Sequence, residues 1–198
     1  MEIILASSSP RRRDLLGKLG WNVRVIVPET DERPLPGESP ENLCVRLSAA
    51  KAAKAAGMIP CNENVPIVGA DTIVVVDGDV LGKPADEDEG FLMLKRLQGR
   101  AHEVLTGVSV IGKGRTLSGM ERTRVSFRAL DDEAARAYAA TGEGADKAGG
   151  YAIQGKGSLL AASIEGDYFN VVGLPLCRLS FMIEEMGLNL PLQWGARI

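Results

Sequence analysis

The most apolar stretch of the chain is IVGADTIVVV, residues 67–76. Val, Ile and Thr favour strands, and a short apolar run bounded by turn residues is typical of a buried strand. The pair Asp77-Gly78 follows directly, and an Asp-Gly pair between apolar segments is a hairpin signal. We therefore expect a buried strand over 67–76 that turns back after its last residue.

One acidic residue, Asp71, lies inside this apolar strand. An ionised carboxylate there is unfavourable unless it is paired, hydrogen-bonded or bound to a metal. With the two-residue period of a strand, Asp71 shares a face with Ile73, whereas Thr72 faces the other way. An exposed strand end or a structural salt bridge would also account for Asp71. The apolar residues on both sides argue against the exposed end, and we favour a functional carboxylate.

The segments around this strand alternate between strand and helix patterns. Further strands are expected over 2–6, 22–27, 103–111, 122–128, 159–164 and 168–172, and helices over 10–19, 40–57, 86–97, 131–140 and 175–186. The order shows no strict βαβ rhythm and includes at least two hairpins, which indicates an α/β fold with a mixed sheet. At about 150 residues per domain, a chain of 198 residues forms a single domain, 1–198, built as two lobes.

Composition excludes several classes of protein. The chain is 45% hydrophobic and 25% charged, which argues against disorder, and its apolar runs are far shorter than the ~20 residues of a membrane span. A net charge of −3 argues against nucleic-acid binding. The N-terminus does not resemble a signal peptide, and the widely spaced Cys44, Cys61 and Cys177 make neither a disulfide framework nor a metal site. We expect a cytoplasmic protein with reduced cysteines.

A strand-to-helix turn carries the sequence SSSPRRR, residues 7–13. The N–H groups and the positive dipole end of such a helix attract anions, hydroxyls add donors, and guanidinium groups match phosphate oxygens. The segment therefore suggests a phosphate site. A capped surface helix with solvated arginines is the alternative explanation.

Several other charged residues could converge on Asp71. Lys51 lies on the polar margin of the helix over 40–57, Lys83 follows the hairpin, and Glu32 lies in an acidic loop. Carboxylates for a hard divalent cation and lysines for the remaining phosphate charge are what a phosphate-handling site needs. Each residue alone is more often a solvated surface charge, so only the combination is informative.

The glycine-rich segment GGYAIQGKGS, residues 149–158, contains a GxxxxGK pattern. A P-loop needs Ser or Thr at the next position, which is Gly157, and it must lie between a strand and a helix; we therefore reject a P-loop. Gln154 in this segment carries a donor and an acceptor suited to a base edge, or it is an ordinary loop amide bonded to backbone. His102, the only histidine, is expected to make a local structural hydrogen bond.

A series of motifs over nearly the whole chain resembles the Maf family of nucleotide pyrophosphatases. In chain order they are SSSPRR (7–12), TDE (30–32), RLSAAK (46–51), GADT (69–72), GKP (82–84), HEVLTGV (102–108), DKAG (146–149) with YAIQG (151–155), and NVVGLP (170–175). The resemblance implies a fold similar to inosine triphosphate pyrophosphatases: an elongated mixed sheet flanked by helices, with two lobes and a deep cleft. It also implies hydrolysis of a nucleoside triphosphate to the monophosphate and pyrophosphate with a divalent cation.

The resemblance also implies roles for individual residues. Asp71 falls on the family's catalytic aspartate and Glu32 on an acidic position, and the two are expected to hold Mg²⁺ or Mn²⁺. Ser7, Ser9, Arg12, Lys51 and Lys83 fall on phosphate-binding positions. As a hypothesis, Asp71 orients and deprotonates, directly or through the metal, a water that attacks the α-phosphorus, and Arg12, Lys51 and Lys83 stabilise the leaving pyrophosphate.

Three positions distinguish the substrate branches of the family. Arg11, Thr72 and Gln154 match the branch that acts on dTTP and UTP, whereas the branch acting on 7-methyl-GTP has an aromatic residue, Gln and Glu there. The alternatives are a nucleotide-binding regulatory module without turnover, a pyrophosphatase for modified purine nucleotides, and a phosphatase that releases single phosphates. A homodimer is expected by fold analogy only.

Overall fold

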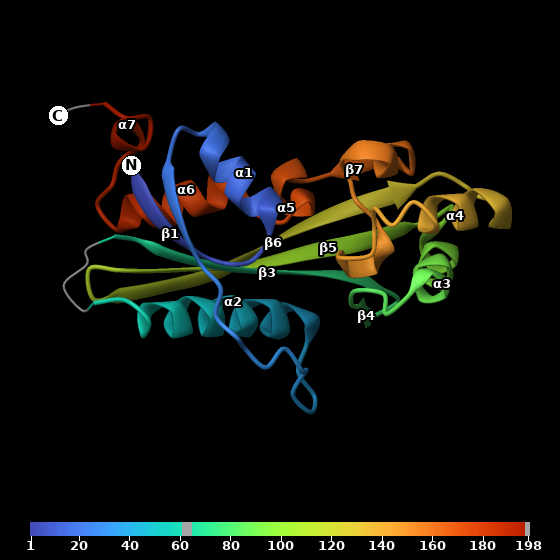
Figure 1. Ribbon diagram of the computed structural model, residues 1–198, viewed down its shortest axis with the longest axis horizontal. Helices are drawn as coiled ribbons and strands as arrows, with labels where there is room; N and C mark the ends of the chain where they lie inside the picture. The colour runs from blue at the N-terminus through green and yellow to red at the C-terminus, as the bar shows by residue number, and fades with distance from the viewer. Residues whose placement is uncertain (61–64, 197–198) are drawn as a thin grey trace. The chain divides into compact units, whose positions relative to one another are not determined.

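The computed structural model describes residues 1–60 and 65–196, and over these residues it contains one seven-stranded sheet (Figure 1). The strands are β1 (Glu2–Ala6), β2 (Asn22–Ile26), β3 (Ile67–Val76), β4 (Asp79–Leu81), β5 (Ala101–Gly112), β6 (Arg115–Phe127) and β7 (Ala161–Glu165). Their order is β2-β1-β3-β5-β6-β7, with β4 paired to β3. Pairs β1·β2 and β1·β3 are parallel, and β3·β4 and β6·β7 are antiparallel. The predicted α/β fold with a mixed sheet is confirmed.

The helices match most of the predicted ranges. They are α1 (Pro10–Lys18), α2 (Pro40–Ala56), α3 (Glu87–Leu97), α4 (Asp132–Ala139), α5 (Tyr168–Val172), α6 (Leu176–Glu185) and α7 (Leu190–Gln193), with short 3-10 helices η1 (Ala148–Gly150) and η2 (Gly155–Leu159). Proline stands at the start of α1 and α2, and Ser39, Asp86 and Asp131 accept cap hydrogen bonds from backbone amides. Local capping chemistry therefore sets these helix starts.

The strand predicted over 168–172 is wrong, because this segment forms α5. The Asn170 side chain is buried and donates hydrogen bonds to the Val104 carbonyl and the Thr123 hydroxyl, both at 2.9 Å. The Thr123 hydroxyl also donates to the Asp167 carbonyl at 3.0 Å. These contacts come from residues more than forty positions away, so they override the strand propensity of Tyr, Phe and Val.

The strand predicted over 122–128 begins earlier than expected, at Arg115. Lys113 and Gly114 both have positive φ, 49° and 70°. Two consecutive residues of this kind are typical of the tight turns that join hairpin strands. The Lys113-Gly114 turn joins β5 directly to β6.

The chain divides into two compact units. Unit 1 comprises residues 1–71, 106–121 and the part from 173 onward, and unit 2 comprises residues 72–105 and 122–172. In unit 1, α2 covers one face of the sheet and α1 and α6 cover the other (Figure 1). A core cluster of Ile4, Ala6, Ala55 and Ile67 lies between α2 and strands β1 and β3.

Helix α2 approaches the sheet very closely at two glycines. A β-carbon on Gly69 of β3 would lie 2.2 Å from the Ser48 carbonyl oxygen, and one on Gly107 of β5 would lie 2.1 Å from that of Cys44. Real β-carbons essentially never come under 3.0 Å, so only glycine permits this packing. The two glycines therefore set the distance between α2 and the strands that it covers.

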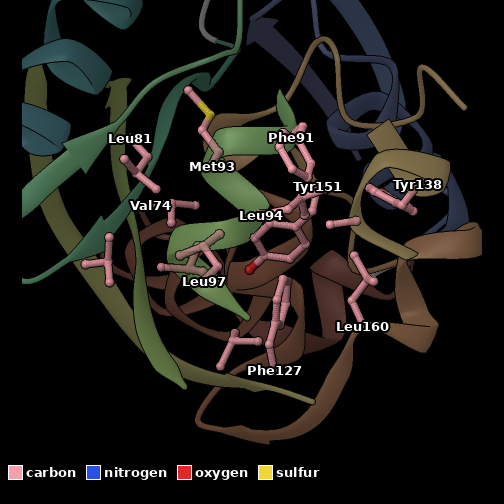
Figure 2. Close-up of a cluster of buried hydrophobic side chains, with 14 residues drawn as sticks. Val74, Leu81, Phe91, Met93, Leu94, Leu97, Phe127, Tyr138, Tyr151 and Leu160 are labelled. Carbon is pink, nitrogen blue, oxygen red and sulfur yellow. The ribbon is translucent and has the colours of Figure 1, made fainter. Parts of the chain in front are cut away.

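Unit 2 has its own hydrophobic core, in which α3 and α4 pack together (Figure 2). Its buried members are Val74, Val76, Leu81, Phe91, Met93, Leu94, Leu97, Val104, Val125, Phe127, Ala135, Tyr138, Tyr151 and Leu160. Phe127 and Tyr151 meet edge to face with ring centroids 4.7 Å apart. The aromatic side chains give this core a specific geometry, since such pairs favour edge-to-face packing.

Within residues 1–60 and 65–196, no helix is long and apolar enough to cross a membrane. Cys44 is buried and Cys177 is exposed, and both are free thiols. Cys61 lies outside the described residues.

Candidate active site

The centre of the site is an ion-paired group in unit 1 made by Asp71, Lys51 and Glu32. The Lys51 ammonium lies 2.6 Å from Asp71 Oδ1 and 2.7 Å from Glu32 Oε1. The side chains of Lys51 and Asp71 are only 13% and 10% exposed, whereas that of Glu32 is 53% exposed. The Asp71 carboxylate therefore lies in a partly dehydrated site, where charge interactions are stronger than in water.

Elements far apart in the sequence bring this group together. Asp71 lies on β3, two residues after Gly69, and Lys51 lies on α2, three residues after Ser48. The close contact between Gly69 and the Ser48 carbonyl therefore also places the Lys51 ammonium beside the Asp71 carboxylate. Glu32 comes from the acidic loop after β2, and the structure thus unites three of the residues predicted from the sequence.

Arg12 lies beside this group as a buried guanidinium. Its Nε donates to the Gly173 carbonyl at 2.7 Å, and its Nη1 donates to the Ala70 carbonyl at 2.9 Å and the Ser7 hydroxyl at 3.1 Å. The pKa of Arg12 lies below its ordinary value, mainly because the guanidinium is buried. The negative charge of Asp71 raises this pKa in opposition, and the positive charge of Arg11 lowers it further. Arg12 therefore ties α1 to β3 next to Asp71, and a contact with phosphate stays a prediction.

Replacing Arg12 with lysine is expected to lower the free energy of unfolding by about 2 kcal/mol, because one ammonium cannot serve three buried acceptors in this fork geometry. Urea denaturation of the purified variant measures the effect. Arg13→Lys on the same helix is the matched control, since the Arg13 side chain is 60% exposed. An Arg12→Lys protein as stable as the Arg13→Lys protein would contradict the structural role.

The start of α1 has no side-chain cap, although serine is a favoured N-cap residue. Ser9 occupies the N-cap position, but its side chain makes no cap hydrogen bond. Ser7 is buried, and its hydroxyl accepts from the Ser9 amide at 3.1 Å as well as from Arg12. Ser7 therefore shapes the turn, and Ser9 stands at the positive end of the helix dipole, where an anion would bind.

The donor atoms of this group fit a hard divalent cation. Asp71 and Glu32 both direct carboxylate oxygens to one positive charge, the Lys51 ammonium. Mg²⁺ in phosphate-transfer sites is held by one or two carboxylates together with substrate phosphates and water. In the part of the chain that the structure describes, no group of three or more His, Cys, Asp or Glu side chains forms a dedicated metal cage. The two carboxylates of Asp71 and Glu32 are therefore suitable ligands for a divalent cation of this kind.

Of the remaining predicted site residues, Arg11 lies on α1 in unit 1, and Thr72, Lys83 and Gln154 belong to unit 2. Thr72 follows Asp71 directly on β3 and is half-buried. Lys83 is exposed just after β4, and the neighbouring Gly82 carbonyl accepts a 2.9 Å hydrogen bond from the Gly149 amide. Gln154 is half-buried at the start of η2, and its side chain does not cap that helix. The Gly82–Gly149 hydrogen bond thus links the segments that carry Lys83 and Gln154.

A comparison of the whole sequence with protein families decides the relationship. The family model for Maf-like proteins matches residues 2–186. The chain belongs to the Maf family.

Named relatives in this family are similar over nearly their full length. The chain is 48% identical to the dTTP/UTP pyrophosphatase of Pelotomaculum thermopropionicum over 95% of this chain and 98% of the relative. It is 50% identical to the dTTP/UTP pyrophosphatase of Symbiobacterium thermophilum over 94% of each chain. The solved Ham1 protein of Staphylococcus aureus aligns with 64% of this chain and 72% of its own, at 14% identity and a TM-score of 0.41.

The histidine in the Maf motif 102–108 makes the predicted structural hydrogen bond. His102 is buried in unit 2, and its Nε2 lies 2.8 Å from the Tyr151 hydroxyl. Its ring meets Phe127 edge to face at a centroid distance of 4.9 Å. Burial lowers the pKa of His102 to about 4, so the ring is neutral at neutral pH. His102 therefore packs in the core of unit 2 and holds the Tyr151 hydroxyl in place.

Sequence reasoning missed a chain of three serine hydroxyls in unit 1, of which those of Ser48 and Ser109 are buried. The Ser48 hydroxyl bonds to that of Ser109, which bonds to that of Ser118, both at 2.8 Å. The first of these bonds joins α2 to β5 near the close contact at Gly107. Glycine inside a strand is a signal for close backbone approach, and it could have pointed to this interface.

Proposed function

We propose that the chain is a dTTP/UTP pyrophosphatase that hydrolyses the nucleoside triphosphate to the monophosphate and pyrophosphate. The observation that carries the proposal is the dehydrated Asp71 carboxylate, held 2.6 Å from the Lys51 ammonium and close to the buried Arg12. A base surrounded by cations suits attack of water on a polyanionic substrate. The high identity to two dTTP/UTP pyrophosphatases supports the choice of substrate.

In this mechanism Asp71 orients a water and accepts its proton while the water oxygen bonds to the α-phosphorus. The bond between the α-phosphorus and the oxygen that bridges to the β-phosphorus breaks, and pyrophosphate leaves with the electron pair. Lys51, Lys83 and Arg12 stabilise the charge that develops on the leaving group. Because Lys51 already contacts Asp71, it also holds the carboxylate in position before the substrate binds.

The phosphates and the base contact different parts of the proposed site. The hydroxyls of Ser7 and Ser9, at the start of α1, bind the phosphate chain with the cationic side chains. Arg11, Thr72 and Gln154 select the pyrimidine, since an amide and a hydroxyl can pair with the edge of a base. Asp71 and Glu32 hold a divalent cation, Mg²⁺ or Mn²⁺. When bound, such a cation neutralises phosphate charge and lowers the pKa of water.

A product assay tests this proposal directly. The purified protein with Mg²⁺ or Mn²⁺ receives dTTP, UTP, CTP, dATP, GTP and 7-methyl-GTP in parallel, and pyrophosphate and monophosphate are quantified. We expect pyrophosphate mainly from dTTP and UTP, and no turnover after the divalent cations are removed with a chelator. Pyrophosphate mainly from 7-methyl-GTP would contradict the roles of Arg11, Thr72 and Gln154.

The same assay separates the other candidate functions. Folded, cation-loaded protein that binds nucleotides without turnover would favour a regulatory module, and release of single phosphates would favour a phosphatase. We further propose that residues 1–198 form one catalytic domain, and that the protein is cytoplasmic and forms a homodimer. Light scattering on the purified chain tests the dimer.

A further inference from the structure

In unit 2, backbone amides of the glycine-rich segment 149–158 bind a carboxylate of the same chain, that of Glu143. The Glu143 carboxylate accepts hydrogen bonds from the Lys156 amide at 3.0 Å and from the Gly157 amide at 2.8 Å. Consecutive backbone amides of this kind often hold a phosphate. Burial raises the pKa of Glu143, but hydrogen bonds from these amides and from Tyr138 outweigh it and lower the pKa below its ordinary value. Glu143 is therefore an ionised carboxylate in the place that an external anion would take.

The glycines of this segment make room for the carboxylate. A β-carbon on Gly155, where φ is +64°, would lie 2.2 Å from Glu143 Oε1. A β-carbon on Gly157 would lie 2.0 Å from the Ala152 carbonyl oxygen and 2.6 Å from the Tyr138 hydroxyl. Glycine is thus required at 155 by the positive φ and at 157 by the close backbone contact with Ala152. This accounts for Gly155, the second glycine of the GxxxxGK pattern, in a chain without a P-loop.

Tyr138 connects the Glu143 carboxylate to the backbone on the N-terminal side of Gln154. Its hydroxyl donates to Glu143 Oε2 and accepts from the Ala152 amide, both at 3.0 Å. Burial, more than any other cause, raises the pKa of Tyr138, so the hydroxyl keeps its proton and can donate. The Tyr138 side chain is part of the buried core cluster of unit 2 (Figure 2). The backbone is therefore held on both sides of Gln154, two residues before it and three residues after it.

We propose that Glu143 and Tyr138 are positioning residues that hold Gln154 for recognition of the pyrimidine. The inference rests on the proposed role of Gln154 in base selection. Neither positioning residue contacts the base. They fix the position of the backbone that carries the Gln154 side chain. When that backbone shifts, the Gln154 amide loses its hydrogen bond to the base, whereas the attack of water on the phosphate is unchanged.

The test compares UTP with CTP, using kcat and KM for each. Glu143→Gln places an NH₂ group against amide donors, and Tyr138→Phe removes the hydroxyl that links Ala152 to Glu143. We expect each variant to raise KM for UTP and to leave kcat nearly unchanged. The UTP-to-CTP ratio of kcat/KM should fall about tenfold, which corresponds to the loss of one hydrogen bond. Glu133→Gln, an exposed carboxylate on the same unit, is the matched control and keeps the ratio of the unaltered protein.

Combining these substitutions with Gln154→Ala distinguishes the positioning of Gln154 from a general loss of order in unit 2. In a Gln154→Ala protein, Glu143→Gln should leave the UTP-to-CTP ratio unchanged, because the amide that it positions is absent. If Gln154→Ala alone leaves the ratio unaltered, the proposed role of Gln154 fails. If Gln154→Ala lowers the ratio but Glu143→Gln and Tyr138→Phe do not, positioning fails while the proposed function stands. Should Glu143→Gln not fold, the milder Tyr138→Phe decides in the same way.

Discussion

Replacing Asp71 with asparagine is expected to lower kcat about a thousandfold or more, the scale on which a general base contributes. Asparagine has nearly the shape of aspartate, but it cannot accept the proton of the attacking water and carries no charge to hold a cation. Lys51 retains its contact with Glu32 at 2.7 Å, so the variant keeps a partner for the largely buried ammonium and should fold. Steady-state pyrophosphate release from UTP measures kcat, and thermal unfolding confirms the fold.

The matched control for Asp71→Asn is Asp79→Asn. Asp79 lies on β4, which pairs with β3, and it also forms an ion pair, 2.8 Å from Arg96. Its side chain is 68% exposed, so we expect kcat within about twofold of the unaltered protein, as for most surface substitutions. Asp71→Asn with a kcat within tenfold of the Asp79→Asn value would exclude Asp71 as the base.

Replacing Gly69 with alanine is expected to destabilise the protein by about 3 kcal/mol or more, the upper range for an overpacked core. The new β-carbon would lie 2.2 Å from the Ser48 carbonyl oxygen, 2.8 Å from the Ala52 amide nitrogen and 3.0 Å from the Ala52 β-carbon. The first two are backbone atoms of α2, which no side-chain rotation can move aside. The helix must therefore shift away from β3, and the Lys51 ammonium must move with it.

Two measurements follow the effect of Gly69→Ala. Urea denaturation gives the loss in the free energy of unfolding, and kcat of any folded protein reports the separation of Lys51 from Asp71. Gly17→Ala in α1 is the control, because nothing lies within 4 Å of its added β-carbon. Alanine favours a helix over glycine by about 0.5–1 kcal/mol, so this control should be slightly more stable than the unaltered protein. Equal stability of the two variants would contradict the close packing of α2.

The elements that the sequence predicted well are those set by neighbouring residues. The apolar run over 67–76 formed β3, Pro10 and Pro40 began helices, and Asp131 capped α4. Asp71 could be singled out for the same reason, because a lone carboxylate in an apolar strand is visible without knowledge of any partner. Its contact with Lys51 was an expectation from charge chemistry, and the structure supplied the distance.

Other features depend on residues that meet only in the folded chain. The segment 168–172 has strand-forming residues, yet Asn170 bonds to Val104 and Thr123 and the segment becomes α5. No local pattern marks Glu143 in the sequence, because the amides from which it accepts hydrogen bonds lie more than ten residues later.

The sequence by itself determined the fold class, the buried strand with its carboxylate and the family. Only the tertiary structure decided that Gly69 and Gly107 bring α2 against the sheet, and that Arg12 bonds to backbone carbonyls of Ala70 and Gly173. The physical reason is the separation along the chain over which each kind of interaction acts. Propensity, periodicity and capping act over a few residues, whereas close packing and buried hydrogen bonds depend on atoms that folding brings together from distant parts of the chain.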